Sequence, residues 1–168
     1  DHTQYQKESE KGIAGGYAEW PHGHGPGLGF SGARVYSSVA FTVPTGANTP
    51  VTFDTERFDT TSYWDAGAPT RFTIPTTGYY HIGGNVRWDT NTAGARRLAG
   101  IRIDGATIIG FAEDVANANG ISQNLQSVYY LTAAQYVELF AFQNSAADRT
   151  LQALVNYSPE FWIHSLGT

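Results

Sequence analysis

The stretch that most constrains the fold is Arg71 to Trp88, in which two short strand patterns flank a Pro-Thr-Thr-Gly turn. The second half alternates strictly, so that every other side chain points to the same face of an extended chain. One face carries the residues that need a core, namely Tyr80, Ile82, Val86 and Trp88. The opposite face carries Tyr79, His81, Asn85 and Arg87. This pattern predicts two strands joined by a tight reversal, with one face of the second strand buried.

Strand patterns of the same kind cover nearly all of the chain after Arg34, and no helical period of useful length occurs. The further predicted strands span residues 35–43, 51–58, 97–103, 106–111, 121–131, 136–143, 151–157 and 161–166. Asp104-Gly105 is a strong signal for a two-residue hairpin, and Pro159 suits a bulge or an edge strand. We therefore expect an all-β domain built from antiparallel sheets.

The composition agrees with many short strands and argues against several classes of protein. Charged residues make up only 15% of the chain, whereas it contains 19 Gly, 10 Tyr and 9 Phe, as expected for strands joined by glycine-bearing turns. A net charge of -5 without a basic stripe argues against a nucleic-acid partner. No apolar run of about 18 residues occurs, so membrane insertion is not expected. Without cysteine there are no disulfides, and oligomerisation is a common alternative source of stability.

The central stretch also resembles a known family. Its Phe-Thr-Ile-Pro-Thr-Thr-Gly-Tyr-Tyr run, residues 72–80, is similar to a Phe-Thr-x-Pro-x-x-Gly-x-Tyr pattern in tumour necrosis factor (TNF) and in the globular heads of the first complement component. Phe53-Asp54 and Phe58-Asp59 match paired Phe/Tyr-Asp positions of that family, whereas Ala134-Gln135 replaces its usual Gly-Asp turn. The resemblance implies an antiparallel jelly-roll sandwich of the TNF-like kind, a compact trimer, and binding without catalysis.

Residues 1–33 differ in kind from the rest, because they are first polar and then rich in Gly, with Pro21 and Pro26. Such a segment cannot bury enough apolar surface to fold alone. We predict an extended N-terminal tether over 1–33 and the jelly-roll domain over 34–168. The opening DHTQYQKESEKGIAGGYAEW resembles linkers between modules of bacteriophage tail fibres. That resemblance implies a fibre on the virion surface, and the absence of Met leads us to expect a longer polypeptide.

Two predicted strands, 136–143 and 161–166, carry large apolar side chains on both faces. The side chains opposite the predicted core are Tyr136, Phe140, Phe142 and Trp162. Leaving aromatic surface in water is unfavourable, so a neighbouring subunit is the simplest cover, and a long loop folded over the sheet is the alternative. The family resemblance favours a homotrimer with these strands on its axis. We therefore predict that these four residues lie at a subunit interface.

Three loops, 89–95, 114–120 and 144–149, are rich in Asn, Asp, Gly and Thr. Because antiparallel strands alternate in direction, all three should lie at the end remote from the tether. Their side chains suit sugar hydroxyls or Ca²⁺, although ordinary turns use the same residues. The candidate ligand-binding residues are Trp88, Asp89, Asn91, Arg96, Asn117, Asn119, Asp148 and Arg149.

His22 and His24 form a His-x-His pair within Pro-His-Gly-His-Gly. In an extended segment both side chains point the same way, and three chains on one axis would present six imidazoles. Six nitrogen ligands suit an octahedral first-row metal better than zinc. The alternative is a plain flexible linker without any metal, and no other cofactor is expected.

The sequence contains no recognisable catalytic motif, whether a nucleophile elbow, a phosphate loop or a zinc-protease helix. Glu113, Asp114 and Asp89 would act as acid and base only if folding brought them together. The resulting hypothesis is a non-enzymatic, homotrimeric phage fibre module that attaches to the host bacterial surface, through glycan, beside other fibre proteins of the virion. Two alternatives are a capsid or tail decoration module that contacts its own virion, and a surface-polysaccharide hydrolase.

Overall fold

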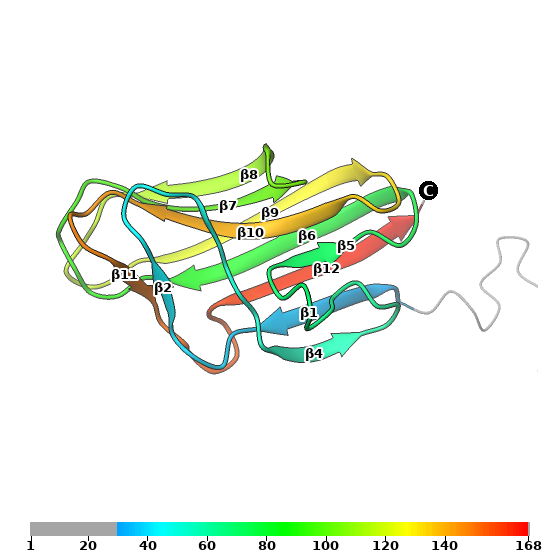
Figure 1. Ribbon diagram of the computed structural model, residues 1–168, viewed down its shortest axis with the longest axis horizontal. Helices are drawn as coiled ribbons and strands as arrows, with labels where there is room; N and C mark the ends of the chain where they lie inside the picture. The colour runs from blue at the N-terminus through cyan, green and yellow to red at the C-terminus, as the bar shows by residue number, and fades with distance from the viewer. Residues whose placement is uncertain (1–29, 168) are drawn as a thin grey trace, which may run out of the picture. The chain divides into compact units, whose positions relative to one another are not determined.

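The computed structural model describes residues 30–167, which form two large antiparallel sheets and a small third one (Figure 1). The first sheet has the order β4-β1-β12-β6-β9. Its strands are β1 (Gly32–Tyr36), β4 (Thr55–Asp59), β6 (Gly78–Arg87), β9 (Ser122–Leu131) and β12 (Glu160–Gly167). The predicted all-β class is confirmed, and the described residues contain no helix.

The second sheet has the order β3-β10-β7-β8, with β5 also paired to β10. Its strands are β3 (Thr49–Pro50), β5 (Arg71–Thr73), β7 (Arg97–Ile103), β8 (Thr107–Asp114) and β10 (Tyr136–Gln143). The small sheet pairs β2 (Phe41–Val43) with β11 (Arg149–Leu151). The core lies between the two large sheets, which face each other as the layers of a sandwich (Figure 1).

The chain divides between Phe30 and Ser31, a few residues before the predicted boundary at 33/34. β1 already begins at Gly32, whose N–H donates to Thr60 Oγ1 over 2.9 Å. Ala33 is fully buried against the core. Gly32 and Ala33 have small side chains, so the sequence shows no alternation of apolar and polar residues there. The start of β1 was therefore not recognisable from the sequence.

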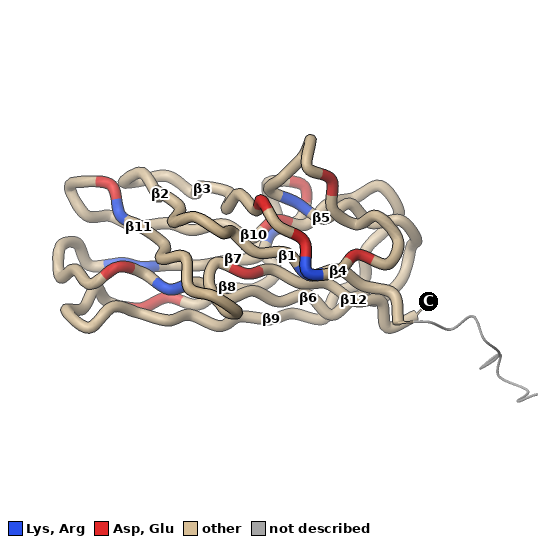
Figure 2. The backbone as a smooth tube through the Cα atoms, turned by 90° about the horizontal axis from the view of Figure 1, so that it is seen from below, with Lys and Arg blue, Asp and Glu red and all other residues tan. Residues whose placement is uncertain are grey.

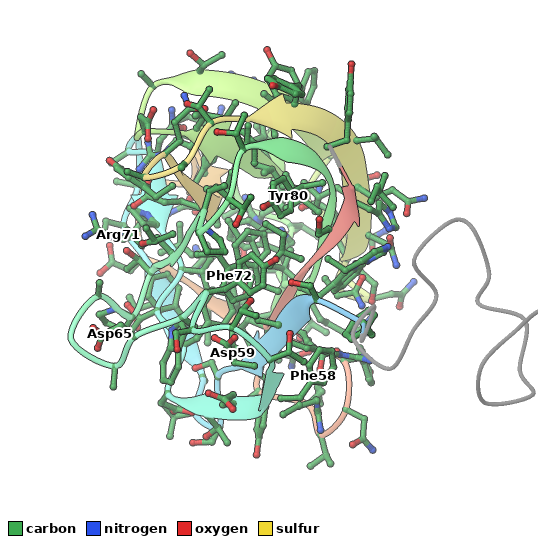
Figure 3. All side chains as sticks on the ribbon, turned by 90° about the vertical axis from the view of Figure 1, so that its right-hand side faces the viewer. Phe58, Asp59, Asp65, Arg71, Phe72 and Tyr80 are labelled. Atoms are coloured by element: carbon green, nitrogen blue, oxygen red, sulfur yellow. The ribbon has the colours of Figure 1, made fainter. Side chains whose placement is uncertain are left out.

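The register predicted for the central strand is confirmed in β6. Tyr80, Ile82, Val86 and Trp88 are each at most 1% exposed, whereas Tyr79 is 52% exposed on the opposite face. Figure 3 shows Tyr80 in the interior between the layers. The alternation therefore assigned the faces of this strand correctly.

Aromatic rings from three parts of the chain meet in the middle of the core. Phe161 stacks on Phe72 with ring centroids 4.7 Å apart and on Phe53 at 5.8 Å. Figure 3 shows Phe72 in the interior beside Tyr80, whereas Asp65 lies on an outer loop. Stacked aromatic pairs add to the free energy gained from burying apolar area. This packing joins β12 and β5 with the segment that connects β3 and β4.

Three predicted strands are shorter than expected. The strand predicted over 35–43 divides into the end of β1 and β2, because residues 37–40 belong to no strand. The strand predicted over 51–58 begins only at residue 55. Residues 51–54 lie between β3 and β4 and form no ladder with another strand. Val51 and Phe53 are nevertheless buried, which produced the apolar pattern. The strand predicted over 151–157 is wrong beyond Leu151, because residues 152–157 lie outside the strands and residues 155–157 form a turn before β12. The predicted hairpin at Asp104-Gly105 is confirmed, with φ of 51° and 73° at the two residues.

The predicted neighbouring subunit is not needed to cover all aromatic side chains of β10. Phe140 is fully buried within the single chain, because its ring lies over Gly100 and its strand pairs with Pro50 of β3. The alternative that the chain covers its own sheet is therefore correct for Phe140, which needs no neighbouring subunit to exclude water. Tyr136 and Phe142 are half-buried on the same outer face.

Candidate functional site

The three polar loops converge at one end of the domain, as the strand directions predicted. Figure 1 shows them at the left, opposite the end at which β1 begins. Asn144 Oδ1 accepts hydrogen bonds from the backbone N–H groups of Ala95 (2.9 Å) and Arg96 (2.8 Å), which ties the first loop to the third. Asn91 forms an isolated bridge with Asn117, which ties the first loop to the second. We call residues 89–96, 114–120 and 144–149 the distal loops.

Trp88 does not belong to a ligand-binding surface, contrary to the prediction. The side chain is fully buried, and its Nε1 donates to Gln123 Oε1 over 2.9 Å. Gln123 Nε2 in turn donates to the carbonyl oxygens of Arg97 and Ala112 and to Asp114 Oδ2. Trp88 therefore supports the base of the distal loops from inside the core.

Arg97 is a buried cation beneath the distal loops that the sequence analysis did not single out. It is fully buried, it lies over the Trp88 ring, and it donates to the carbonyl oxygens of Ala93 (2.8 Å) and Arg96 (3.0 Å). Burial lowers the pKa of Arg97, and repulsion from Arg149 adds to that effect while attraction to Asp89 opposes it. The sequence could have shown that Arg97 is buried, because Arg97 alternates with Ala99 and Ile101 on the buried face of β7.

Asp89 and Arg149 lie near this cation and are only half exposed. Asp89 Oδ1 is buried without a hydrogen-bond partner in the part of the chain that the structure describes. Arg149 Nε donates to Ser145 Oγ over 2.9 Å. Arg149 therefore stabilises the third distal loop through Ser145, whereas Asp89 acts on Arg97 through the attraction between their charges.

The asparagine and aspartate side chains at the surface of the distal loops fall into two groups, and Asn91 is half-buried whereas Asn117, Asn119 and Asp148 are exposed. Asn91 and Asn117 accept hydrogen bonds from the backbone N–H groups two residues onward, at 2.7 Å in both cases, so they stabilise turns. Asn119 and Asp148 are exposed, and neither side chain is engaged by another described residue. The second pair is therefore available to a ligand.

Arg96 and Glu113 form an exposed ion pair at the margin of the distal loops. Arg96 Nε lies 2.5 Å from Glu113 Oε1, and Nη2 lies 2.9 Å from Oε2. The hydrogen bonds of this pair raise the pKa of Arg96 and lower the pKa of Glu113. Because Glu113 binds Arg96 and Asp114 binds Gln123, these carboxylates do not form an acid–base pair with each other.

A second feature is the outer face of the first sheet, which exposes large apolar side chains. The exposed fractions are 57% at Val128, 52% at Tyr79, 49% at Tyr130 and 54% at Leu166. Tyr79 and Tyr130 are paired across β6 and β9 with ring centroids 5.1 Å apart. A contiguous apolar patch of this kind is characteristic of an interaction surface.

The four predicted interface residues lie on two different sheets. Trp162 belongs to the outer face of the first sheet, where its ring covers Gly83. Tyr136, Phe140 and Phe142 belong to the second sheet. Arg71 lies over the Tyr136 ring and Arg96 over the Phe142 ring, so cations of the same chain already cover part of these two side chains. Among the four, Trp162 alone lies on the exposed apolar face described above.

The metal predictions have different outcomes. His22 and His24 lie outside the described residues. Within residues 30–167 no group of three or more His, Cys, Asp or Glu side chains is placed to hold a metal ion. The distal loops therefore offer no carboxylate cluster for Ca²⁺ in the part of the chain that the structure describes.

Figure 2 shows that the charged residues of the described domain are few and mixed in sign, with basic residues near acidic ones. The buried Glu160 is an example, because Arg34 and Arg57 both bind its carboxylate, at 2.6 Å and 2.5 Å. No helix with the length and apolarity of a membrane span occurs in residues 30–167.

Comparison with known proteins identifies the fold. The domain superposes on murine APRIL (TM-score 0.61, 10% identity, 82% of this chain and 100% of that one). The fold is TNF-like. It also matches Eiger TNF from S. frugiperda (TM-score 0.57, 12% identity, 82% and 93% coverage) and the globular domain of zebrafish complement 1qA protein (TM-score 0.52, 14% identity, 81% and 97% coverage).

These structural neighbours confirm the predicted TNF-like jelly roll. No family model matches the sequence, and no curated protein matches it either. At such low identity the likeness concerns the TNF-like fold alone.

Proposed function

We propose that this chain is a non-enzymatic, homotrimeric fibre module of a bacteriophage virion that attaches to the host bacterial surface by binding glycan. The observation that carries the proposal is the convergence of the three distal loops at the end opposite the start of β1 (Figure 1). A module carried on an N-terminal tether has to present its ligand site away from that tether. The resemblance of the opening residues to phage fibre linkers supplies the biological setting.

The chemistry of the distal loops supports a sugar ligand. Asn119 and Asp148 offer an amide and a carboxylate to solvent, and Arg96 is exposed although bound to Glu113. Sugar hydroxyl groups both donate and accept hydrogen bonds, so these groups match them. The loops are fixed by hydrogen bonds to each other, which lowers the entropic penalty of binding. Each site is shallow, and its affinity for a single sugar is weak.

Assembly into a trimer compensates for weak individual sites. The exposed apolar face of the first sheet, with Tyr79, Val128 and Tyr130, is the surface that a second copy would cover. Three sites on one axis can bind a repeating polymer with an avidity roughly 100-fold or more above the affinity of one site. We therefore infer that binding to whole cells depends steeply on the trimer.

Replacing Asn119 and Asp148 together by alanine tests the proposed site. Both side chains are exposed and support no turn, so the fold and the trimer should be unchanged. Cell binding by the full chain should fall at least about tenfold, because each lost polar contact contributes about 1 kcal/mol. Flow cytometry with labelled protein measures this change, and Glu56→Ala, an exposed carboxylate outside the loops, is the control.

Undiminished binding by the folded double variant would contradict the proposed site. Release of reducing sugar from the cells by the wild-type chain would instead favour the hydrolase alternative. Absence of any cell binding, combined with binding to purified virion proteins, would favour a decoration module.

A further inference from the structure

A small pocket lies where β1 ends, beside the segment that connects β11 with β12. It has a volume of about 210 Å³ and is lined by Tyr36 of β1, Arg57 of β4, and residues 37–38 and 153–155. The N–H of Ser37 donates to the carbonyl oxygen of Pro159 over 3.0 Å, which joins the two chain segments. Sites for drug-sized ligands have roughly 300–1,000 Å³, so this pocket suits one small molecule or one sugar unit.

Arg57 reaches this pocket because of an irregularity in the pairing of β1 with β4. The register shifts between Arg34 and Val35 of β1, and Arg57 is the residue of β4 left without a partner in the ladder. An extra residue of this kind re-aims its side chain, and such bulges are frequent beside active sites. Arg57 thus extends across β1 to Glu160 on β12, two strands away in the sheet.

Two contacts fix the guanidinium group of Arg57. Its Nε donates to Glu160 Oε1 over 2.5 Å, and its Cζ lies 4.4 Å from the centroid of the Tyr36 ring. Glu160 is fully buried, and Arg34 Nη2 donates to its other carboxylate oxygen over 2.6 Å. The N–H groups on Nη1 and Nη2 of Arg57 have no hydrogen-bond partner among the described residues. A rigidly held pair of donors is therefore available to a ligand.

This pair of donors matches a carboxylate, because the parallel N–H groups of a guanidinium bind both oxygens of one carboxylate group. The neighbouring charges leave Arg57 available for it. Glu160 is shared between Arg34 and Arg57, so one carboxylate is set against two cations. A further carboxylate, Asp54, accepts from the backbone N–H and the hydroxyl group of Ser38, at 2.9 Å and 2.8 Å. Asp54 is thus engaged by donors other than Arg57.

The remaining walls of the pocket suit the body of an acidic sugar. Residues 153–155 provide an apolar wall, and Val155 is 83% exposed. The hydroxyl groups of Ser37 and Ser38 already donate to other protein oxygens, so their own oxygens remain acceptors. A sugar ring has C–H groups on its faces and hydroxyl groups around its edge. The pocket therefore offers a partner to each part of a sugar that carries a carboxylate.

We propose that this pocket binds a single hexuronate unit, with its carboxylate on Arg57 and its ring against Leu154 and Val155. The pocket lies outside the distal loops, on the β1–β4 side of the first sheet, whereas the exposed Tyr79 and Tyr130 lie on β6 and β9. The proposal does not depend on attachment to cells, because it concerns a second site that free sugars can reach.

The test titrates the full chain with methyl β-D-glucuronide at neutral pH and follows binding by NMR. Methyl β-D-glucoside, which lacks the carboxylate, is the matched sugar. The wild-type chain should bind the glucuronide saturably and the glucoside at least about tenfold more weakly, because the hydrogen bonds to a charged group are lost. Arg57→Gln should lower the affinity for the glucuronide at least about tenfold for the same reason. Arg57→Lys should restore only part of it, because an ammonium group lacks the planar pair of donors.

Two further variants make the result specific to the pocket. Arg102→Gln is the matched control, because Arg102 Nε also donates to a glutamate, Glu138, over 2.9 Å, and its guanidinium lies over the Phe140 ring of the second sheet. This variant should bind the glucuronide as the wild type does. Val155→Asp changes an exposed side chain, so the fold should be kept. The new carboxylate should repel the glucuronide and lower its affinity at least about tenfold.

Circular dichroism checks that each variant is folded, and Val155→Asp decides the test if Arg57→Gln does not fold. Failure of the wild-type chain to bind the glucuronide, or equal binding of glucuronide and glucoside, would overturn the proposal. Binding that survives both Arg57→Gln and Val155→Asp would overturn it as well. Acetate bound as tightly as the glucuronide would show a plain anion site and would contradict a sugar ligand.

Discussion

Replacing Trp88 by alanine is expected to lower the free energy of unfolding by about 3–5 kcal/mol, the largest loss of stability that we predict for one residue. The indole is fully buried at the base of the distal loops. Its removal leaves a cavity between the sheets and takes away the ring that lies against Arg97. It also leaves Gln123 Oε1 without its donor. Urea denaturation followed by circular dichroism measures the change.

Two further variants show how much of the lost stability comes from the Nε1 hydrogen bond and how much from the buried position of the indole. Trp88→Phe keeps most of the ring and loses the Nε1 donor, so it should cost about 1–3 kcal/mol. Trp64→Ala removes a half-buried indole on a loop and should cost less than Trp88→Ala. A Trp88→Ala variant as stable as the wild type would contradict the buried position of this side chain.

Introducing aspartate at both Tyr79 and Tyr130 is expected to convert the proposed trimer into monomers. The two rings contact each other on the exposed apolar face of the first sheet. A carboxylate placed in a dry interface loses its hydration without gaining a partner, which costs about 3 kcal/mol or more. The association constant should fall by roughly a hundredfold or more. Sedimentation velocity at micromolar concentration resolves the two states.

Phe111→Asp is the matched control for this experiment. Phe111 is 63% exposed on β8 of the second sheet, so its replacement should leave the fold and the trimer intact. Dissociation by Phe111→Asp, with the Tyr79/Tyr130 variant still assembled, would move the interface to the second sheet. A wild-type chain that is monomeric at micromolar concentration would refute the assembly.

Local alternation in the sequence was sufficient to predict the central strand and its two faces. Tyr80 and Ile82 have to be buried together because extended chain repeats every two residues. A second rule, that successive antiparallel strands alternate in direction, placed the distal loops at one end, since each follows a strand of the same direction. Neither rule could show which loop side chains are engaged. Asn91 and Asn117 cap turns while Asn119 and Asp148 remain available, and these contacts depend on the paths of the loops.

The errors came from contacts between residues far apart in the sequence. Phe140 alternates as an outward residue, and it is buried only because Gly100 on β7 leaves room for its ring and β3 pairs beside it. Trp88 was predicted to bind ligand because it adjoins Asp89, although the alternating pattern of the strand already placed its side chain in the core. Arg57 and Glu160 are 103 positions apart, so only the strand order β4-β1-β12 brings them together.

The most direct test of the proposed function is a binding isotherm of the full chain on intact host cells, before and after mild periodate oxidation of the surface glycan. We expect saturable binding to untreated cells and its loss, by at least about tenfold, after oxidation, with no sugar released at any stage. Loss of binding should be matched by competition with the purified surface polysaccharide. Equal binding to oxidised and untreated cells would contradict a glycan receptor, and absence of binding to any bacterial cell would contradict the attachment function itself.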